Sequence, residues 1–344
     1  MNVLVVGGAG YIGSHMVRML GAVGCKVWVL DNLSTGFMQA VTAGELIVGD
    51  MNDSELVKSI LGDNGIDVVM HFAACALVGE SCINPAKYYQ NNVVNTLLLL
   101  EAMRETDVRK IVFSSTCATY GVPDKVPISE STPQQPVNPY GFTKLVIERA
   151  LRDYSEAHNF GYAALRYFNA AGASPLGGIG EDHSPESHLI PIVLQAALGQ
   201  RDCVTVFGSD WPTIDGSCVR DYIHVDDLAD AHLRAMERLQ VGKGIEVNLG
   251  TGMGFSVRQI IETCREVTGV DIKSVDGDRR AGDPPELVAD ASKAKEVLGW
   301  VPQYTTPKSV IETAWAWHQG NPHGYANKTP ADQMELSGPS TGNE

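Results

Sequence analysis

Two side chains capable of acid–base chemistry, Tyr140 and Lys144, stand four residues apart in this chain. On a helix that spacing brings both to one face. Upstream, the polar run Ser114–Gly121 follows Lys110–Phe113, whose apolar residues predict a buried strand. A hydroxyl at the end of that strand, beside the Tyr–Lys pair, would form a proton-transfer device. In it, Tyr140 would act as the base and Thr116 would hold the oxygen that loses its proton.

The elements that would position this device begin with a glycine turn. A Val-rich run, Asn2–Val6, precedes Gly7–Gly13, which contains a GxxGxxG array; a second strand, Lys26–Leu30, then leads to Asp31. This order predicts a dinucleotide site with the pyrophosphate at a helix N-terminus. A carboxylate at Asp31 can accept hydrogen bonds from both ribose hydroxyls and would repel a 2′-phosphate. We therefore expect NAD rather than NADP.

Short strand–helix units continue to about Phe168 and predict an α/β fold with a parallel, doubly wound (Rossmann) sheet. Ligands of such sheets bind beyond the carboxyl ends of the strands, where Asp50, Phe72, Ala73 and Ser114 fall. His71, at one of these ends, is expected to be a packing residue rather than a ligand.

The chain divides by composition at about residue 170. We expect residues 1–170 to form an NAD-binding Rossmann domain, rejoined by parts of 225–250. Residues 171–325 are expected to form a smaller α/β substrate-binding domain. The polar residues 326–344 lack periodicity, and we expect them to be disordered.

Composition excludes several classes of function. The chain is 44% hydrophobic and 19% charged, as in globular proteins, and its net charge of −15 argues against nucleic-acid or anionic-membrane partners. Seven scattered cysteines without a CxxC pair favour reduced cytoplasmic thiols over disulfides or a zinc site, and we expect no metal. The N-terminal run predicts a strand, not a signal peptide, and no stretch approaches the ~20 apolar residues of a membrane span.

The proposed base needs help from its surroundings. A tyrosine hydroxyl has a pKa near 10, too high for efficient base catalysis at pH 7. The Lys144 ammonium and a positively charged nicotinamide ring would both favour the phenolate. Tyr140 could then take a proton from a substrate hydroxyl as hydride leaves the same carbon for NAD. The alternative is a packed Tyr140 and a solvated Lys144, which the glycine turn upstream disfavours.

Further motifs identify a resemblance that runs from Met1 to about Tyr325. The first-half motifs are Val6–His15, Asp31–Leu33, His71–Ala74, Val78–Ser81, Pro85, Tyr88–Tyr89, Asn91–Asn92, Phe113–Thr116, Pro139–Gly141 and Lys144. The second-half motifs, which are the more specific, are Leu165–Asn169, Gly180–Asp182, Val219–Val225, Asp227–Ala229, Asn248–Gly250, Arg280, Gly282–Asp283 and Asp290–Lys293. The chain resembles the extended short-chain dehydrogenase/reductase superfamily and, within it, the UDP-glucose 4-epimerase family.

The resemblance implies interconversion of UDP-glucose and UDP-galactose with NAD as a retained cofactor. Tyr140 would remove the proton of the sugar 4-hydroxyl while NAD takes the C4 hydride. The 4-keto sugar would turn over, and the hydride would return to its other face. Such a cycle demands a firm grip on the diphosphate, for which Arg220 and Arg280 match the family's positions, and a loose grip on the sugar. Asp283 matches a ribose contact. For Arg220, a surface ion pair with Asp221 is the alternative.

Strand ends and resemblance together give the expected contact residues. Catalysis is assigned to Thr116, Tyr140 and Lys144. The expected NAD contacts are Gly7, Gly10, Tyr11, Ile12, Gly13, Asp31, Asn32, Asp50, Met51, Phe72, Ala73, Ala74, Asn91, Ser114, Tyr140, Lys144 and Phe168. The expected substrate contacts are Thr116, Tyr140, Asn169, His188, Leu189, Val206, Phe207, Arg220, Tyr222, Arg280, Asp283 and Leu287.

Several positions depart from the family pattern. Thr116 replaces a common Ser and keeps the hydroxyl, Ala76 replaces a Lys over the nicotinamide ribose, and Ser187-His188 replaces a pair of Asn. Leu287 lies where the family sets the room for the sugar. Leucine is smaller than an aromatic residue there, so we hypothesise that UDP-N-acetylglucosamine and UDP-N-acetylgalactosamine are also accepted.

Other interpretations of the sequence are enzymes with the same fold, or proteins that have only NAD binding in common with the epimerase family. A 4,6-dehydratase needs an acid–base pair after Thr116, where this chain has Cys117-Ala118. A decarboxylase, a simple alcohol dehydrogenase and a non-catalytic NAD-binding module are further alternatives. The resemblance also implies a homodimer formed through helices expected at Tyr88–Arg104 and Pro139–His158.

Overall fold

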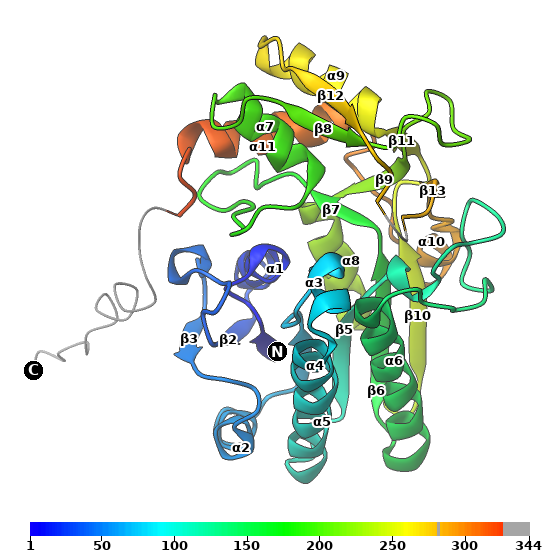
Figure 1. Cartoon of the computed structure of the whole chain (residues 1–344). Coiled ribbons are helices and arrows are strands. Elements are labelled where there is room, and N and C mark those ends of the chain that lie inside the picture. Colours follow the sequence, from blue (N-terminus) through cyan, green and yellow to red (C-terminus); the bar gives the residue numbers. More distant parts are fainter. Residues whose placement is uncertain (281–282, 326–344) are drawn as a thin grey trace, which may run out of the picture.

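The computed structural model describes residues 1–280 and 283–325, and its main body is a seven-stranded parallel sheet (Figure 1). Its strands, in spatial order, are β10 (Gly244–Leu249), β6 (Gly161–Tyr167), β5 (Lys110–Thr116), β4 (Val68–His71), β1 (Asn2–Val6), β2 (Lys26–Asp31) and β3 (Glu45–Val48). The predicted doubly wound sheet is therefore confirmed. The predicted tail, 326–344, and Gly282 lie outside the described residues.

Each face of this sheet is covered by helices. Successive residues of a strand point to opposite faces, so Val3 and Val5 enter one core and Leu4 and Val6 enter the other. The first core is closed by α1 (Tyr11–Ala22), α8 (Val225–Arg238) and α10 (Ser292–Leu298). The second is closed by α2 (Ser54–Asp63), α5 (Asn95–Glu105) and α6 (Pro139–His158).

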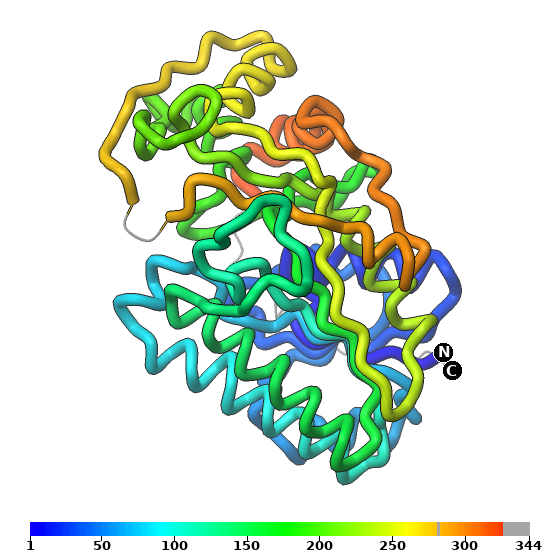
Figure 2. The backbone as a smooth tube through the Cα atoms, turned by 90° about the vertical axis from the view of Figure 1, so that its right-hand side faces the viewer, coloured from blue at the N-terminus to red at the C-terminus, as the bar shows by residue number. Residues whose placement is uncertain are grey.

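The strand predicted to rejoin the sheet does so as β10. It pairs in parallel with β6, from Gly244 opposite Tyr162 to Leu249 opposite Tyr167. Figure 2 shows this late segment running beside the earlier strand. Because β10 follows α8 in the chain, residues of the second half complete the edge of the seven-stranded sheet.

A smaller region lies beyond the carboxyl ends of the main strands (Figure 1). Its central strand β9 (Val219–His224) pairs with β7 (Asn169–Ala171), β11 (Gly254–Ser256) and β13 (Glu286–Leu287). A separate pair is formed by β8 (Val204–Phe207) and β12 (Ser274–Gly277). The helices α7 (Leu189–Ala197), α9 (Val257–Thr268) and α11 (Pro307–Gly320) share its apolar core.

The helical run predicted at Tyr88–Arg104 is confirmed, but it contains a π-helical turn. The structure has α3 (Val78–Ile83) and α4 (Pro85–Tyr88), then a π-helical turn η2 (Tyr89–Val94), and then α5. In this turn the Asn92 side chain accepts from Cys75 N at 2.9 Å and donates to Cys75 O at 3.0 Å. These bonds to a distant backbone segment accompany the altered helical winding. The apolar periodicity of the sequence does not reveal these hydrogen bonds.

Other expectations at the residue level are also settled. β5 extends to Thr116, so Ser114 and Thr116 belong to the strand and not to a following loop. Two short 3₁₀ turns are η1 (Met38–Ala40) and η3 (Cys117–Thr119). His71 is 1% exposed and its Nε2 lies 2.8 Å from Thr96 Oγ1, which confirms a packing role. All seven cysteines, which fall within the described ranges, are free thiols. Within those ranges no helix is both long and apolar enough to cross a membrane.

A buried ionic network fixes α6 against the sheet. The fully buried carboxylate of Glu148 accepts two hydrogen bonds from Arg166, from Nε at 2.9 Å and from Nη2 at 2.7 Å. It accepts a third from Ser115 Oγ at 2.5 Å. Arg166 Nη2 also reaches Glu246 on β10 at 2.9 Å, and Arg152 binds the same carboxylate at 2.6 and 2.7 Å. One helix and three strands therefore meet at these charges.

Replacing Glu148 with Ala is expected to lower the free energy of unfolding by about 3–5 kcal/mol, because the Arg166 guanidinium stays buried with only part of its counter-charge. Denaturant and thermal unfolding measure this. The exposed Glu156, two turns further along α6, is the matched control, and its change to Ala should cost less than about 0.5 kcal/mol. Equal losses in the two variants would contradict the role assigned to the network.

Candidate active site

The predicted acid–base residues come together at the carboxyl end of β5. Helix α6 begins at Pro139, and the Asn138 side chain caps it by accepting from Gly141 N at 2.8 Å. In the first turns of α6 the Tyr140 hydroxyl comes beside the Thr116 side chain. Lys144 Nζ donates to the Ser114 carbonyl at 2.7 Å. The predicted spacing on one helical face is thus what aligns both side chains with β5.

Burial dominates the electrostatics of this pair. It raises the pKa of Tyr140 to about 12, against the opposing effect of the Thr116 side chain. It lowers the pKa of Lys144 to about 7, although the charge of Glu148 opposes the shift. In the protein alone, burial thus outweighs any effect of Lys144 on the pKa of Tyr140, and the expected joint effect of Lys144 and a nicotinamide ring stays a prediction. The ammonium is itself disfavoured by burial and is directed at a backbone carbonyl.

The glycine turn is too crowded for side chains at two of its glycines. Gly7 has a φ of +81°, and a Cβ there would lie 2.4 Å from Ala73 N. A Cβ on Gly13 would lie 2.2 Å from Gly7 O, so α1 packs directly on the turn. At Gly10 the nearest atom to such a Cβ is Gly7 O at 3.5 Å, which leaves open space. Side chains are excluded where the backbone is crowded, and a ligand has room at Gly10.

The N-terminus of α1 faces that open space with free amides. Gly10 is its N-cap, and among the described residues no side chain caps it and none in its first turn is acidic. An uncapped helix N-terminus carries partial positive charge and presents N–H donors to an anion. These features fit the pyrophosphate of a dinucleotide.

Asp31 links the glycine turn to the end of β2. Its Oδ2 accepts from Ala9 N and its Oδ1 from Leu33 N, each at 2.9 Å. Burial raises the pKa of Asp31, and the two amides oppose that shift. Each carboxylate oxygen keeps a further acceptor site, as ribose hydroxyls require. Asn32 Nδ2 donates to Asp50 Oδ2 at 2.7 Å, which joins two other expected NAD contacts.

In the smaller region the predicted arginines lie near strand β9. Arg220 Nη2 lies 3.8 Å from Asp283 Oδ1, so two predicted substrate contacts are neighbours. The guanidinium of Arg280 stacks over the Phe207 ring at 3.9 Å. The alternative ion pair of Arg220 with Asp221 is not formed: Asp221 is fully buried and accepts from the amides and hydroxyl of the segment 251–252.

The remaining predicted contacts divide by the direction of their side chains. Met51, Val206 and Tyr222 pack mainly in apolar cores. Other side chains pack at least partly against protein or hydrogen-bond to it, and these are Tyr11, Ile12, Phe72, Ala73, Asn91, Phe168, His188 and Leu189. Ala74 and Asn169 are partly exposed, Asn169 opposite Tyr222, and Leu287 pairs opposite Arg220.

The structure adds residues that the sequence interpretation missed. Tyr167 at the end of β6 forms a short hydrogen bond with Ser114 Oγ, next to the Tyr140 site. Glu148 anchors the helix that carries Tyr140 and Lys144. Glu148 continues their spacing by four more residues, and that regularity could have indicated a third inward-facing group.

Fold and glycine turn together define a Rossmann-type dinucleotide-binding protein. The model of the NAD dependent epimerase/dehydratase family matches residues 3–250, and the chain belongs to this family.

Relatives match along almost the whole chain. A UDP-glucose 4-epimerase of Halalkalibacterium halodurans is 54% identical over 97% of this chain and 100% of its own length. The structure of a UDP-glucose 4-epimerase from Brucella ovis in complex with NAD is 48% identical, with a TM-score of 0.89 over 92% of this chain and 97% of that one. The UDP-Glc/GlcNAc 4-epimerase of Campylobacter jejuni is 42% identical, with a TM-score of 0.81 over 93% and 99%.

Proposed function

We propose that this protein interconverts UDP-glucose and UDP-galactose, using NAD that stays bound through the cycle. The observation that carries the proposal is that Tyr140 and Thr116 meet at the end of β5, with Lys144 one helical turn away. The similarity to UDP-glucose 4-epimerases over nearly the full chain supports the same reaction.

The glycine turn, the α1 N-terminus and Asp31 would hold NAD, which supplies the hydride acceptor and donor for C4 of the sugar. Thr116 would position the 4-hydroxyl oxygen, and Tyr140 would remove its proton. Because burial raises the pKa of Tyr140 to about 12 in the protein alone, positive charge beside its ring is needed to populate the phenolate. Lys144 would add to that charge whenever it is protonated.

Retention of the intermediate would depend on the smaller region. Arg220 and Arg280 present guanidinium groups suited to the two phosphates. Their present neighbours, Asp283 and the Phe207 ring, hold them near β9 and β8. A substrate anchored at its diphosphate leaves the sugar free to turn over, so that either face of the 4-keto carbon can receive hydride.

The dehydratase alternative is disfavoured by the residue after Thr116. Cys117 is 7% exposed, and burial raises the pKa of its thiol to about 12. A thiol that remains protonated in this way is a poor base at neutral pH, and Ala118 has no titratable group. The acid–base pair that elimination of water requires is therefore missing at these two positions.

Incubation of the purified protein with UDP-galactose, without added NAD, is expected to yield UDP-glucose, which NMR of the sugar protons can follow. Tyr140→Phe should lower kcat by about 10²–10⁴-fold through loss of the base, whereas Tyr154→Phe on the same helix should retain activity. A 4-keto-6-deoxy product would refute the proposal in favour of the dehydratase. An inactive wild-type protein would favour a binding module.

We propose further that N-acetylated UDP-hexosamines are accepted. Leu287 is half-buried beside the cluster that includes Phe168, Cys117 and Ile128, and it leaves more room than an aromatic side chain. The relative from Campylobacter jejuni bears the name UDP-Glc/GlcNAc 4-epimerase, which agrees with such breadth.

Replacing Leu287 with Tyr should lower kcat/KM for UDP-N-acetylglucosamine at least about tenfold while changing that for UDP-glucose much less, because steric exclusion of a group costs more than about 1.4 kcal/mol. Coupled assays with both substrates measure the ratio. Replacing Leu287 with Met conserves volume and should leave the ratio unchanged. Failure of the wild-type protein to turn over the N-acetylated sugar would contradict the proposal.

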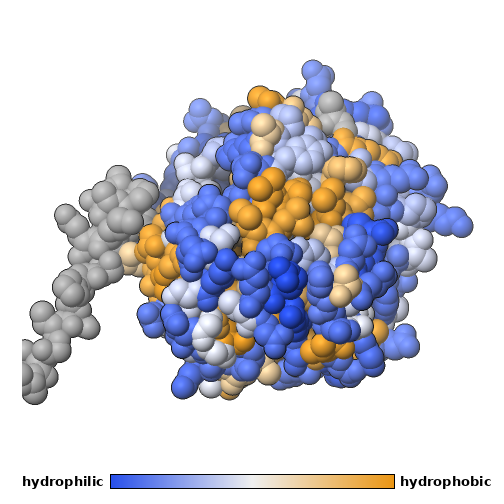
Figure 3. All heavy atoms as spheres, turned by 90° about the horizontal axis from the view of Figure 1, so that it is seen from below, coloured by the Kyte–Doolittle hydropathy of each residue, from blue (hydrophilic) through white to orange (hydrophobic). Residues whose placement is uncertain are grey.

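We also propose a homodimer formed through the segments that include η2, α5 and α6. Tyr89, Val94 and Phe142 are 40%, 41% and 45% exposed, and the rings of Tyr89 and Phe142 lie 6.4 Å apart. Separately, Figure 3 shows apolar residues among hydrophilic ones on the surface seen from below. Exposed apolar side chains that lie together, as Tyr89 and Phe142 do, are typical of an association site.

Val94→Arg should convert the dimer to a monomer, because a charge would be buried at the interface. Light scattering coupled to size-exclusion chromatography gives the mass. Val301, 55% exposed and outside these segments, is the control position, and Val301→Arg should stay dimeric. A wild-type monomer, or dissociation of both variants alike, would contradict this interface.

We propose that the protein is cytoplasmic, and its free thiols support this. Activity found outside the cytoplasmic fraction of the cell would contradict it.

We also propose that residues 1–170, with parts of 225–250, bind NAD and that residues 171–325 bind the substrate.

A further inference from the structure

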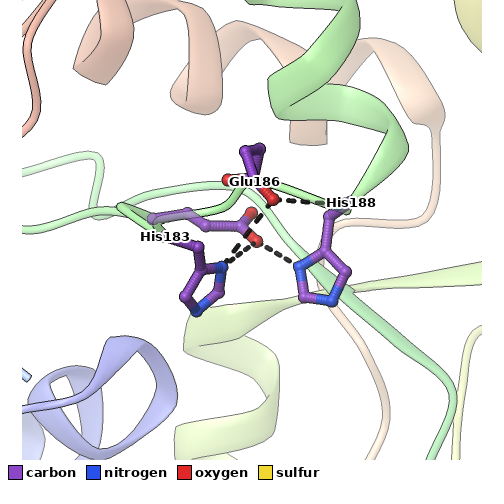
Figure 4. Close-up of side chains that lie close together, drawn as sticks. His183, Glu186 and His188 are labelled. Atoms are coloured by element: carbon purple, nitrogen blue, oxygen red, sulfur yellow. Dashed lines mark hydrogen bonds and ion pairs between the residues drawn. The ribbon is translucent and has the colours of Figure 1, made fainter. Parts of the chain in front are cut away.

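Four potential metal ligands converge in the segment between β7 and α7. Glu181, His183, Glu186 and His188 each direct one ligand atom to a common point, and these atoms lie within 4.8 Å of one another. Figure 4 shows both imidazole rings turned toward the carboxylates from opposite sides. The expectation of no metal rested on the cysteines, and these ligands are of other types.

Two of the distances are close to those of a small tetrahedral site: His183 Nδ1 lies 3.2 Å from Glu181 Oε1 and 3.8 Å from Glu186 Oε1. His188 Nδ1 is hydrogen-bonded to Glu181 Oε1, and these two atoms must move apart to bind the same ion. Zinc binds His nitrogen and carboxylate oxygen at ~2.0–2.2 Å, which places tetrahedral ligand atoms about 3.4 Å apart. Both histidines turn Nδ1, a possible metal ligand, toward the carboxylates.

The charges of the four groups also match a divalent cation. Two carboxylates neutralise a 2+ ion when both imidazoles are neutral. The rings of His183 and His188 lie 5.3 Å apart, so one ion can lie between them.

The surroundings hold the ligands in place and leave a path for entry. The Glu181 and Glu186 side chains are each 3% exposed, whereas those of His183 and His188 are 30% and 47% exposed. Glu186 Oε1 accepts from the amides of Ser187 and His188 at 2.7 and 2.8 Å, which fixes its carboxylate. The buried acids would thus be preorganised, and the histidines would close over the ion from the solvent side.

We propose that Glu181, His183, Glu186 and His188 form a structural site for a divalent transition metal, with zinc as the best fit. Imidazole ligands favour zinc and its neighbours over magnesium or calcium, which prefer all-oxygen sites. Four protein ligands leave no open position, so the ion holds structure and performs no chemistry. The ring of His183 packs edge-on against that of Tyr11, 6.1 Å away, so the ion would fix this segment against the glycine turn.

The test uses the untagged full chain. Elemental analysis after purification without chelators, followed by zinc titration of the chelator-stripped protein against a competing dye, should give one zinc per chain. Zinc should also raise the Tm of the stripped protein. His183→Ala and Glu186→Gln should each weaken zinc binding at least about 100-fold, beyond the loss typical of an outer-shell partner. His158→Ala, an exposed histidine at the end of α6, should bind as the wild type does.

Cobalt provides a readout that does not depend on stability. Co²⁺ in the stripped protein should give the intense visible absorption of tetrahedral coordination, and His183→Ala should abolish it. Stoichiometric zinc uptake that both ligand variants leave unchanged would overturn the proposal, as would a stripped wild-type protein that takes up no zinc. A weak octahedral cobalt spectrum would overturn the four-ligand site.

Discussion

The position of the candidate active site depends on one buried carboxylate, that of Glu148. Tyr140, Lys144 and Glu148 occupy successive turns of one face of α6, so an ion pair at Glu148 sets the rotation and height of the other two. Its partner Arg166 is on β6, its hydroxyl donor Ser115 is on β5 between Ser114 and Thr116, and the network extends to Glu246 on β10. The strand that offers Thr116 and the helix that offers Tyr140 are thus held by the same charges.

This arrangement has an electrostatic consequence for chemistry. The network requires α6 to be buried against the sheet, and burial moves the pKa values of Tyr140 and Lys144 in the directions that favour their neutral forms. A buried pair whose neutral forms are favoured responds strongly to any positive charge brought next to it, because little water screens the interaction. The site is therefore sensitive to what occupies the glycine turn.

Much of this could be predicted from sequence because it is local. The glycine turn, the Asp after β2 and the Tyr–Lys spacing are short patterns with direct steric or helical causes. What could not be predicted depends on distant partners. The π-helical turn η2 accompanies an amide of Asn92 bound to the backbone of Cys75, and the raised pKa of Tyr140 comes from burial by several elements. Asp221 was a candidate partner for Arg220, yet it binds the 251–252 turn. The individual NAD and substrate contacts stay predictions.

The pairing of β10 with β6 also bears on how the protein can be divided. The polypeptide leaves the nucleotide-binding sheet after β6, returns for α8 and β10, leaves again for β11, and returns once more for α10. A fragment ending near residue 170 would expose the open edge of β6 and the apolar surface that α8 and α10 cover. The two regions are consequently interwoven rather than modular. Neither one could be transplanted or inherited as a contiguous piece of chain.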